Sequence, residues 1–204
     1  MRVSLLNVLI ELEKQIKSSK NLVTKIKNLG LPRIQVEIIV ELAFLRAFMA
    51  WESFLEESFI RYLVGGKLYS GHSPRRFVNP PNLGRATKII LGEGKEYIGW
   101  NSASSVIARS EIYFEAGEPY KNALIGAVRD IDNMNTIRNR IAHKSTSSRS
   151  KFNDFIRREF GYGVSGMTPG RFLLRNTISN PQINYFGYYL VIIDTAAREI
   201  LFKV

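Results

Sequence analysis

Apolar residues recur along most of this chain at the spacing expected of amphipathic helices. Two long helices are predicted first, over residues 4–29 and 34–64, because apolar side chains fall at positions i, i+3 and i+4 in both. Gly30 and Pro32 separate them, since glycine favours the left-handed end of a helix and proline cannot continue its hydrogen-bond ladder. Gly65 marks the end of the second helix, whose wide aromatic face we interpret as core.

The helical pattern fails between residues 65 and 104, and we interpret this stretch as an irregular insertion. Proline, glycine and asparagine crowd it, and only Arg85 to Leu91 has helical spacing. A long irregular segment inside a compact domain is usually functional or mobile.

Helical spacing returns after the insertion and predicts helices over residues 105–115, 120–142 and 184–202. Between the last two, Ser150 is expected to cap a short helix that runs to Phe160. The rest of residues 144–182 is expected to form a basic loop region. Because no strand-like alternation persists, we expect one all-α domain, an antiparallel helical bundle with long irregular insertions.

Composition narrows the class of protein without naming a function. The chain has 204 residues, 45% hydrophobic and 23% charged, which is ordinary for one globular domain. The absence of cysteine excludes a disulfide scaffold, a thiolate metal site and a cysteine nucleophile. With only two histidines, we expect no metal and no cofactor. Polar residues interrupt the N-terminal apolar run, so we expect no signal peptide, no membrane span and a cytoplasmic location.

Positive charge is concentrated in one part of the sequence. The net charge is +11, and residues 138–175 hold nine Lys or Arg against two Asp or Glu. This segment is either a solvated basic surface or a face that binds a polyanion, for which RNA is the leading candidate. The candidate RNA-binding residues are Arg140, Lys144, Arg149, Lys151, Arg171 and Arg175.

One arginine falls in the middle of an apolar helix face. At about 100° per residue, Arg138 lies with the apolar residues of the 120–142 helix, and Asn135 lies on the same face. Burying an arginine without a carboxylate or phosphate partner would cost several kcal/mol, so we expect a partner. Glu52 is the preferred one among four glutamates along one edge of the 34–64 helix, namely Glu37, Glu41, Glu52 and Glu56. The pair could be purely structural or could belong to a functional site.

The stretch from Ile137 to His143 resembles the Arg-polar-x-x-x-His motif of HEPN (higher eukaryotes and prokaryotes nucleotide-binding) domains. Asn139 follows the arginine, the motif ends an amphipathic helix, and a long aromatic helix precedes it across an insertion. The resemblance covers residues 34–64 and 105–145 in layout. HEPN domains are helical bundles common in prokaryotic toxin–antitoxin, phage-defence and CRISPR-associated systems.

The resemblance implies metal-independent RNA cleavage by 2′-OH transesterification at a homodimer interface, with Arg138, Asn139 and His143 as the catalytic residues. Their chemistry suits this role. An imidazole with a pKa near neutrality can transfer the protons, arginine can neutralise charge on the phosphorane, and asparagine can position either group. Some family toxins carry a tyrosine two positions after the histidine as an acceptor for inhibitory nucleotidylation, whereas this chain has Ser145 there.

The spacing leaves a geometric question open. In an unbroken helix Arg138 and His143 would lie about 140° apart, so one helix would not aim both at one phosphate. Either the helix unwinds near His143, or a second protomer supplies the complementary residue.

Two alternatives to a ribonuclease remain at the level of sequence. The chain could be a non-catalytic RNA-binding or interaction module that keeps the motif for dimer structure. It could also be a structural subunit whose basic surface meets an acidic antitoxin or another defence-system partner protein.

Overall fold

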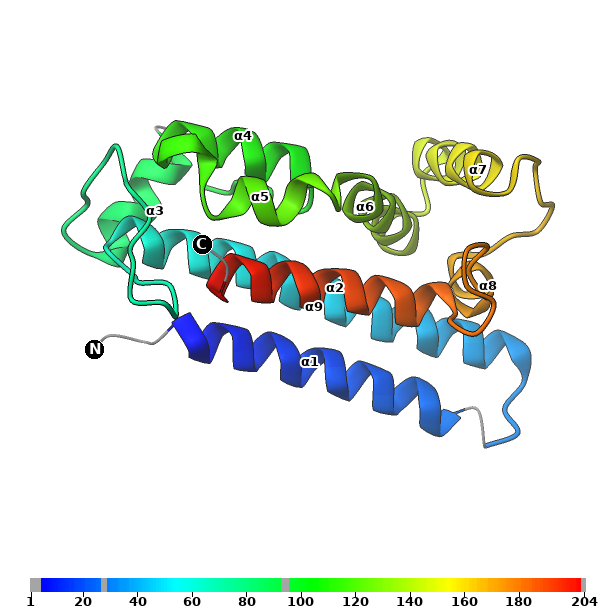
Figure 1. Ribbon diagram of the computed structural model, residues 1–204. Helices are drawn as coiled ribbons and strands as arrows, with labels where there is room; N and C mark the ends of the chain where they lie inside the picture. The colour runs from blue at the N-terminus through cyan, green and yellow to red at the C-terminus, as the bar shows by residue number, and fades with distance from the viewer. Residues whose placement is uncertain (1–4, 27–28, 93–95, 203–204) are drawn as a thin grey trace.

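The computed structural model describes residues 5–26, 29–92 and 96–202, and within them the protein is all-α (Figure 1). In these ranges no strand forms, and two isolated bridges join Arg76 to Phe114 and Asn176 to Asn184. The helices, with one 3₁₀ turn at Glu115–Gly117, are α1 (Leu5–Ile26), α2 (Arg33–Leu63), α3 (Leu83–Leu91), α4 (Ala103–Tyr113), α5 (Tyr120–Ile125), α6 (Val128–Ala142), α7 (Thr146–Phe160), α8 (Pro169–Leu174) and α9 (Tyr185–Phe202).

Helices α2 and α9 form the middle of the bundle, between α1 on one side and α4, α5 and α6 on the other (Figure 1). Helix α1 runs antiparallel to α2, as expected, but α9 runs in the same direction as α2. Their C-terminal ends lie together, because the Tyr62 hydroxyl donates to the Ile200 carbonyl at 2.9 Å and the Tyr69 amide donates to the Leu201 carbonyl at 3.0 Å. The bundle is therefore mixed in direction.

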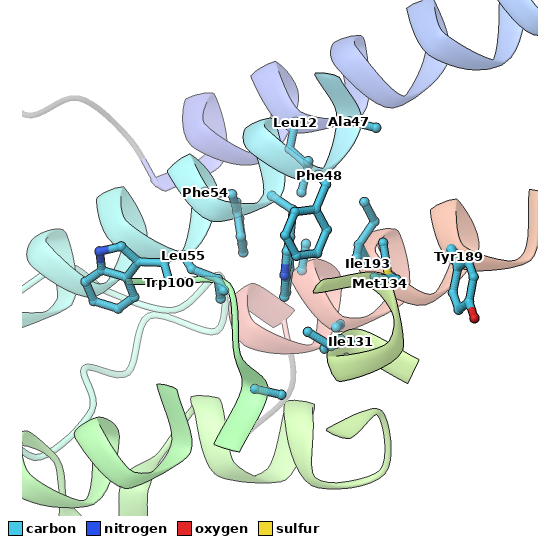
Figure 2. Packing of buried hydrophobic residues seen from close by; sticks show 14 of the residues in the cluster. Leu12, Ala47, Phe48, Phe54, Leu55, Trp100, Ile131, Met134, Tyr189 and Ile193 are labelled. Atoms are coloured by element: carbon cyan, nitrogen blue, oxygen red, sulfur yellow. The ribbon is translucent and has the colours of Figure 1, made fainter. Parts of the chain in front are cut away.

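The aromatic face of α2 is the core of the protein. Its Phe44, Phe48, Trp51 and Phe59 are each fully buried, which confirms that this stripe is core. Figure 2 shows Phe48 near Ile131 and Met134 of α6 and Ile193 of α9. A large apolar side chain buried in this way typically stabilises a fold by about 1.5–3 kcal/mol. Helix α2 is therefore the main element against which the other helices pack.

The insertion is anchored to the bundle on both sides of its undescribed residues 93–95. Trp100 is buried, with its ring centroid 5.2 Å from that of Phe59 in α2. The Arg76 guanidinium donates to the Leu63 carbonyl at 2.8 Å, and Asn82 caps α3 by accepting from the Arg85 amide. The short helix expected at 85–91 is confirmed as α3.

The single helix expected over residues 120–142 is wrong, because the chain breaks into α5 and α6 at Gly126 and Ala127. The Ala127 amide bonds to the Leu124 carbonyl, three residues back, instead of continuing the α-helical ladder. Glycine costs about 1 kcal/mol relative to alanine within a helix, which favours a break here. Periodicity did not reveal the break because both pieces bury apolar residues.

Two expectations for residues 144–182 are also wrong. Ser145, not Ser150, caps α7, and its hydroxyl accepts from the Ser148 amide at 3.2 Å. The first two turns of α7 are largely solvent-exposed and polar, so the sequence there has the composition of a loop. Helix α8 lies within the expected loop and is too short to show a helical period. Its Gly170 packs against the Glu37 backbone so closely that an added Cβ would lie 2.5 Å from the Glu37 carbonyl oxygen.

None of the helices in the described ranges is long and apolar enough to cross a bilayer.

Candidate functional site

Helix α6 carries the motif and is held by its apolar side. Ile131, Met134 and Ile137 are buried against the bundle, which leaves Arg138 at the edge of the core with a side chain 24% exposed. Arg138 Nη2 lies 3.9 Å from Glu52 Oε2, so the ion pair expected with α2 is present. The pairing is loose, because Arg138 Nε and Glu52 Oε1 are both buried and have no hydrogen-bond partner among the described residues.

A chain of polar contacts continues from this pair along α6. Arg138 Nη1 donates to Asn139 Oδ1 at 3.1 Å, and Asn139 Nδ2 donates to Asn135 Oδ1 at 3.1 Å. The structure thus brings together Glu52, Asn135, Arg138 and Asn139. The asparagines orient one edge of the guanidinium, which limits the directions in which Arg138 can present its remaining N–H groups.

The electrostatics of the cluster are those of a partly desolvated ion pair. Burial raises the pKa of Glu52, and the charge of Arg138 offsets only part of that effect. Burial also raises the pKa of Tyr97, and the charge of Glu52 is the next largest cause. This phenol of the insertion therefore interacts electrostatically with the Glu52–Arg138 pair. Sequence reasoning missed Tyr97, and its aromatic character within a polar insertion was the only available signal.

Arg109 of α4 is a second residue that sequence reasoning missed. It lies over the Trp100 ring, with Cζ 4.2 Å from the ring centroid, and its Nη2 donates to the Gly99 carbonyl at 3.1 Å. Burial lowers the pKa of Arg109, whereas the charge of Glu56 raises it. Arg109 therefore holds Gly99 and Trp100 of the insertion against α4.

His143 ends α6 in an extended conformation, with φ −127° and ψ 122°. The helix therefore unwinds at this residue, which is the first of the two geometries expected from the sequence. Its backbone is held on both sides: its amide donates to the Asn139 carbonyl at 3.0 Å, and its carbonyl accepts from Ser148 Oγ at 2.5 Å. The residue is exposed, and in the described ranges no hydrogen bond joins its imidazole to Arg138.

The candidate RNA-binding residues fall into two groups. The first group lies at the end of α6 and along α7, where Arg140 is half-buried and the others are exposed: Arg140, Lys144, Arg149 and Lys151. The second group, Arg171 and Arg175, lies in and just after α8.

Arg171 is already bound within the protein. Its Nε lies 2.9 Å from Glu37 Oε1, and its Nη1 donates to the Gly166 carbonyl. Burial raises the pKa of Glu37, but hydrogen bonds from Arg171 and Thr168 outweigh it and the pKa is lowered overall. Arg171 thus ties α8 to α2, while Arg175 lies over the Phe160 ring at 4.8 Å.

The described residues offer no set of ligands for a metal ion. Across residues 5–26, 29–92 and 96–202, no group of three or more His, Cys, Asp or Glu side chains could hold a metal ion. No family model matches the chain, and searches of curated proteins and of solved structures gave no match. The motif and its geometry are therefore the basis for any functional assignment.

Proposed function

We propose that this protein is a metal-independent endoribonuclease of the HEPN type. The observation that carries the proposal is the presence of two functional residues at the end of α6, one fixed through its side chain and the other through its backbone. Arg138 is oriented by Glu52 and Asn139 at the edge of the core, and one turn later His143 has a fixed backbone and an exposed side chain. A structural ion pair alone would not require the helix to end at an exposed histidine.

The residues support transesterification within the RNA. The substrate 2′-oxygen attacks the adjacent phosphorus while its proton passes to a base, and the bond to the 5′-oxygen breaks as that oxygen gains a proton. His143 can serve in either proton transfer, and Arg138 can stabilise the negative charge of the phosphorane. The products are a 2′,3′-cyclic phosphate and a 5′-hydroxyl.

A second copy of the chain would complete the site. Helix α2 has an exposed apolar stripe, 50–67% exposed and spaced by helical turns, formed by Ile34, Ile38, Leu42 and Met49. We call these four residues the α2 stripe. Exposed apolar side chains that line up on one helix face often mark a surface that contacts another protein.

A glutamate next to the α2 stripe is electrostatically coupled to the end of α6. Burial raises the pKa of Glu41, which precedes Leu42, whereas the Gly170 amide and then the charges of Arg140 and Lys144 lower it. Glu41 is therefore within electrostatic reach of the end of α6. Two copies that bury the stripe around a two-fold axis would bring their motifs to one interface, so we propose a homodimer.

Because the motif resembles that of HEPN toxins and phage-defence effectors, we propose that the protein acts in a toxin–antitoxin or phage-defence system. An RNA-binding module without catalysis is the competing function, and one experiment separates the two. Purified protein is incubated with end-labelled RNA in EDTA, beside His143→Ala and a control, His72→Ala, which removes the other histidine from an exposed loop.

We expect wild type and His72→Ala to yield 2′,3′-cyclic phosphate ends, and His143→Ala to be slower by about 10²–10⁴-fold. A 2′-deoxy nucleotide at the cleaved position should abolish cleavage there. Wild-type protein that binds RNA and leaves it intact would assign the chain to the binding module, and 5′-phosphate products would rule out the mechanism.

A further inference from the structure

A groove with a volume of about 440 Å³ lies between the end of α6, helix α7 and the loop before α8. Arg140, Arg149 and Arg157 line it, and its described lining contains no aspartate or glutamate. The volume falls within the range of roughly 300–1,000 Å³ that small-ligand sites occupy. We call this feature the arginine groove.

The rest of the lining is mixed in character. Ile156 and Phe152 are buried, and Val164 and Met167 from the loop are partly buried against them, which gives the groove an apolar side. Asn153 and Ser165 supply neutral donors and acceptors. Cations beside an apolar surface match the two halves of a nucleotide, its phosphate and its base.

The other side of the same loop provides a comparison. A smaller pocket of about 170 Å³ there is also lined by three arginines, Arg33, Arg171 and Arg175. Glu37 neutralises two of these, with Arg33 Nε at 3.1 Å and Arg171 Nε at 2.9 Å. That pocket is an internal ion-pair network that joins α8 to α2.

The arginine groove lacks such compensation. In the described part of the chain, neither Arg140 nor Arg149 has a carboxylate oxygen within the 4.0 Å of an ion pair. Among the described residues, Arg157 has only Asp154 as an ion-pair partner, at 3.2 Å on its own exposed helix face, and such a pair contributes little to stability. The charges of Arg149 and Arg157 are therefore available to an external anion, whereas Arg140 also interacts electrostatically with Glu41 of α2.

The groove is physically joined to the motif. Arg140 lies two residues after Arg138, and its Nη1 donates to the His143 carbonyl at 3.4 Å. Ser148, in the first turn of α7, donates to the same carbonyl. Because α7 carries Arg149 and Arg157, the wall of the groove is fixed relative to His143.

We propose that the arginine groove binds a nucleotide of single-stranded RNA next to the cleaved position, with Arg140, Arg149 and Arg157 on its phosphates and its base against the apolar side. The position relative to cleavage rests on the proposed ribonuclease function, whereas the binding of RNA in the groove does not. Arg149 and Arg157 are binding residues here, distinct from the residues that transfer protons.

The test measures binding and cleavage separately. A short fluorescent single-stranded RNA is titrated against full-length His143→Ala protein by anisotropy at several salt concentrations, so that cleavage does not interfere. Arg149→Gln with Arg157→Gln removes two charges from the groove. It is compared in that background with Lys17→Gln plus Arg158→Gln, which removes two charges from exposed helical positions outside the groove. ATP is added as a competitor, since a free nucleotide presents the same chemistry.

We expect the double groove variant to raise the Kd for RNA by about tenfold or more, and to reduce the slope of log K against log salt by about 1.4. The control double variant should change the Kd by no more than about twofold. Equal effects of the groove and control variants would overturn the proposal. So would ATP binding that depends on Arg149 and Arg157 when RNA binding does not.

The cleavage arm distinguishes failure of the groove from failure of the ribonuclease. In the His143-containing protein, the groove variant should raise KM and leave kcat nearly unchanged, and a lost kcat with an unchanged KM would contradict the groove. Groove-dependent RNA binding by a wild-type protein that cleaves nothing supports the groove and refutes only the ribonuclease.

Discussion

Arg138 and Glu52 form an ion pair in which some hydrogen-bonding groups have no partner, although each residue needs the charge of the other. Their nearest charged atoms are 3.9 Å apart, and one buried polar atom on each side lacks a hydrogen-bond partner in the described structure. Partial burial strengthens their attraction, but it also raises the cost of leaving either charge alone. The pair therefore holds Arg138 in place without consuming all of its donors.

At the residue scale we predict that Arg138→Gln destabilises the protein in a pH-dependent way. Burial already raises the Glu52 pKa above its ordinary 4.5, and removing Arg138 should raise it further. A carboxyl whose folded pKa is raised contributes stability that is present below its unfolded pKa and lost as pH rises through the folded pKa. Urea unfolding should therefore show a loss of about 1–3 kcal/mol near pH 7 and a smaller loss near pH 4.

The control for this prediction is the double variant Glu52→Gln with Arg138→Gln. With no ionisable group left in the pair, the added pH dependence should disappear, and part of the stability should return. A loss of stability by Arg138→Gln that is the same near pH 4 and near pH 7 would show that Glu52 and Arg138 do not interact.

At the scale of elements, helix ends decide where the functional side chains lie. The Ser145 cap starts α7 two residues after His143, and this tight connection places Ser148 against the His143 carbonyl. The break at Gly126 gives α6 its own orientation, independent of α5. The cap and the break, rather than the apolar faces, position the end of the motif.

We predict that Ser145→Ala lowers the free energy of unfolding by about 1 kcal/mol, because the Ser148 amide loses its side-chain acceptor. Ser150→Ala is the matched control, since Ser150 is exposed within the same helix and should change stability by less than about 0.5 kcal/mol. Urea unfolding measures both variants. A larger effect at Ser150 would mean that α7 begins where the sequence pattern placed it.

At the scale of the whole molecule, the α2 helix has two apolar sides. One side builds the core, and the other is the exposed α2 stripe. A monomer gains nothing from exposing this second side. The proposed dimer would bury it and unite two motifs.

We predict that Ile38→Asp and Leu42→Asp, each placing a charge in the α2 stripe, convert a dimer into a monomer and reduce RNA cleavage. Ile112→Asp on α4 is the control, because Ile112 is 66% exposed and lies outside the stripe. Sedimentation velocity over a range of concentrations measures the oligomeric state. Wild-type protein that stays monomeric throughout, or stripe variants that remain fully dimeric, would refute this interface.

The sequence alone determined the features that depend on neighbouring residues. Helical periodicity located α1, α2 and α9, and the spacing of Arg85 to Leu91 located α3. The buried face of α6 and the expectation that Arg138 needs a carboxylate followed from the same local pattern, because side-chain spacing on a helix is set by its backbone geometry.

Only the tertiary structure decided the features that depend on distant residues. It assigned Glu37 to Arg171, Glu41 to the Gly170 amide and Glu52 to Arg138, although all three glutamates lie on one helix edge. It also formed α8, whose six residues carry no helical period and are held by packing on α2. For α8 these contacts join residues that are 129 and 134 apart in the chain, and the pair of Glu52 and Arg138 likewise joins two helices far apart in sequence, which no local pattern contains.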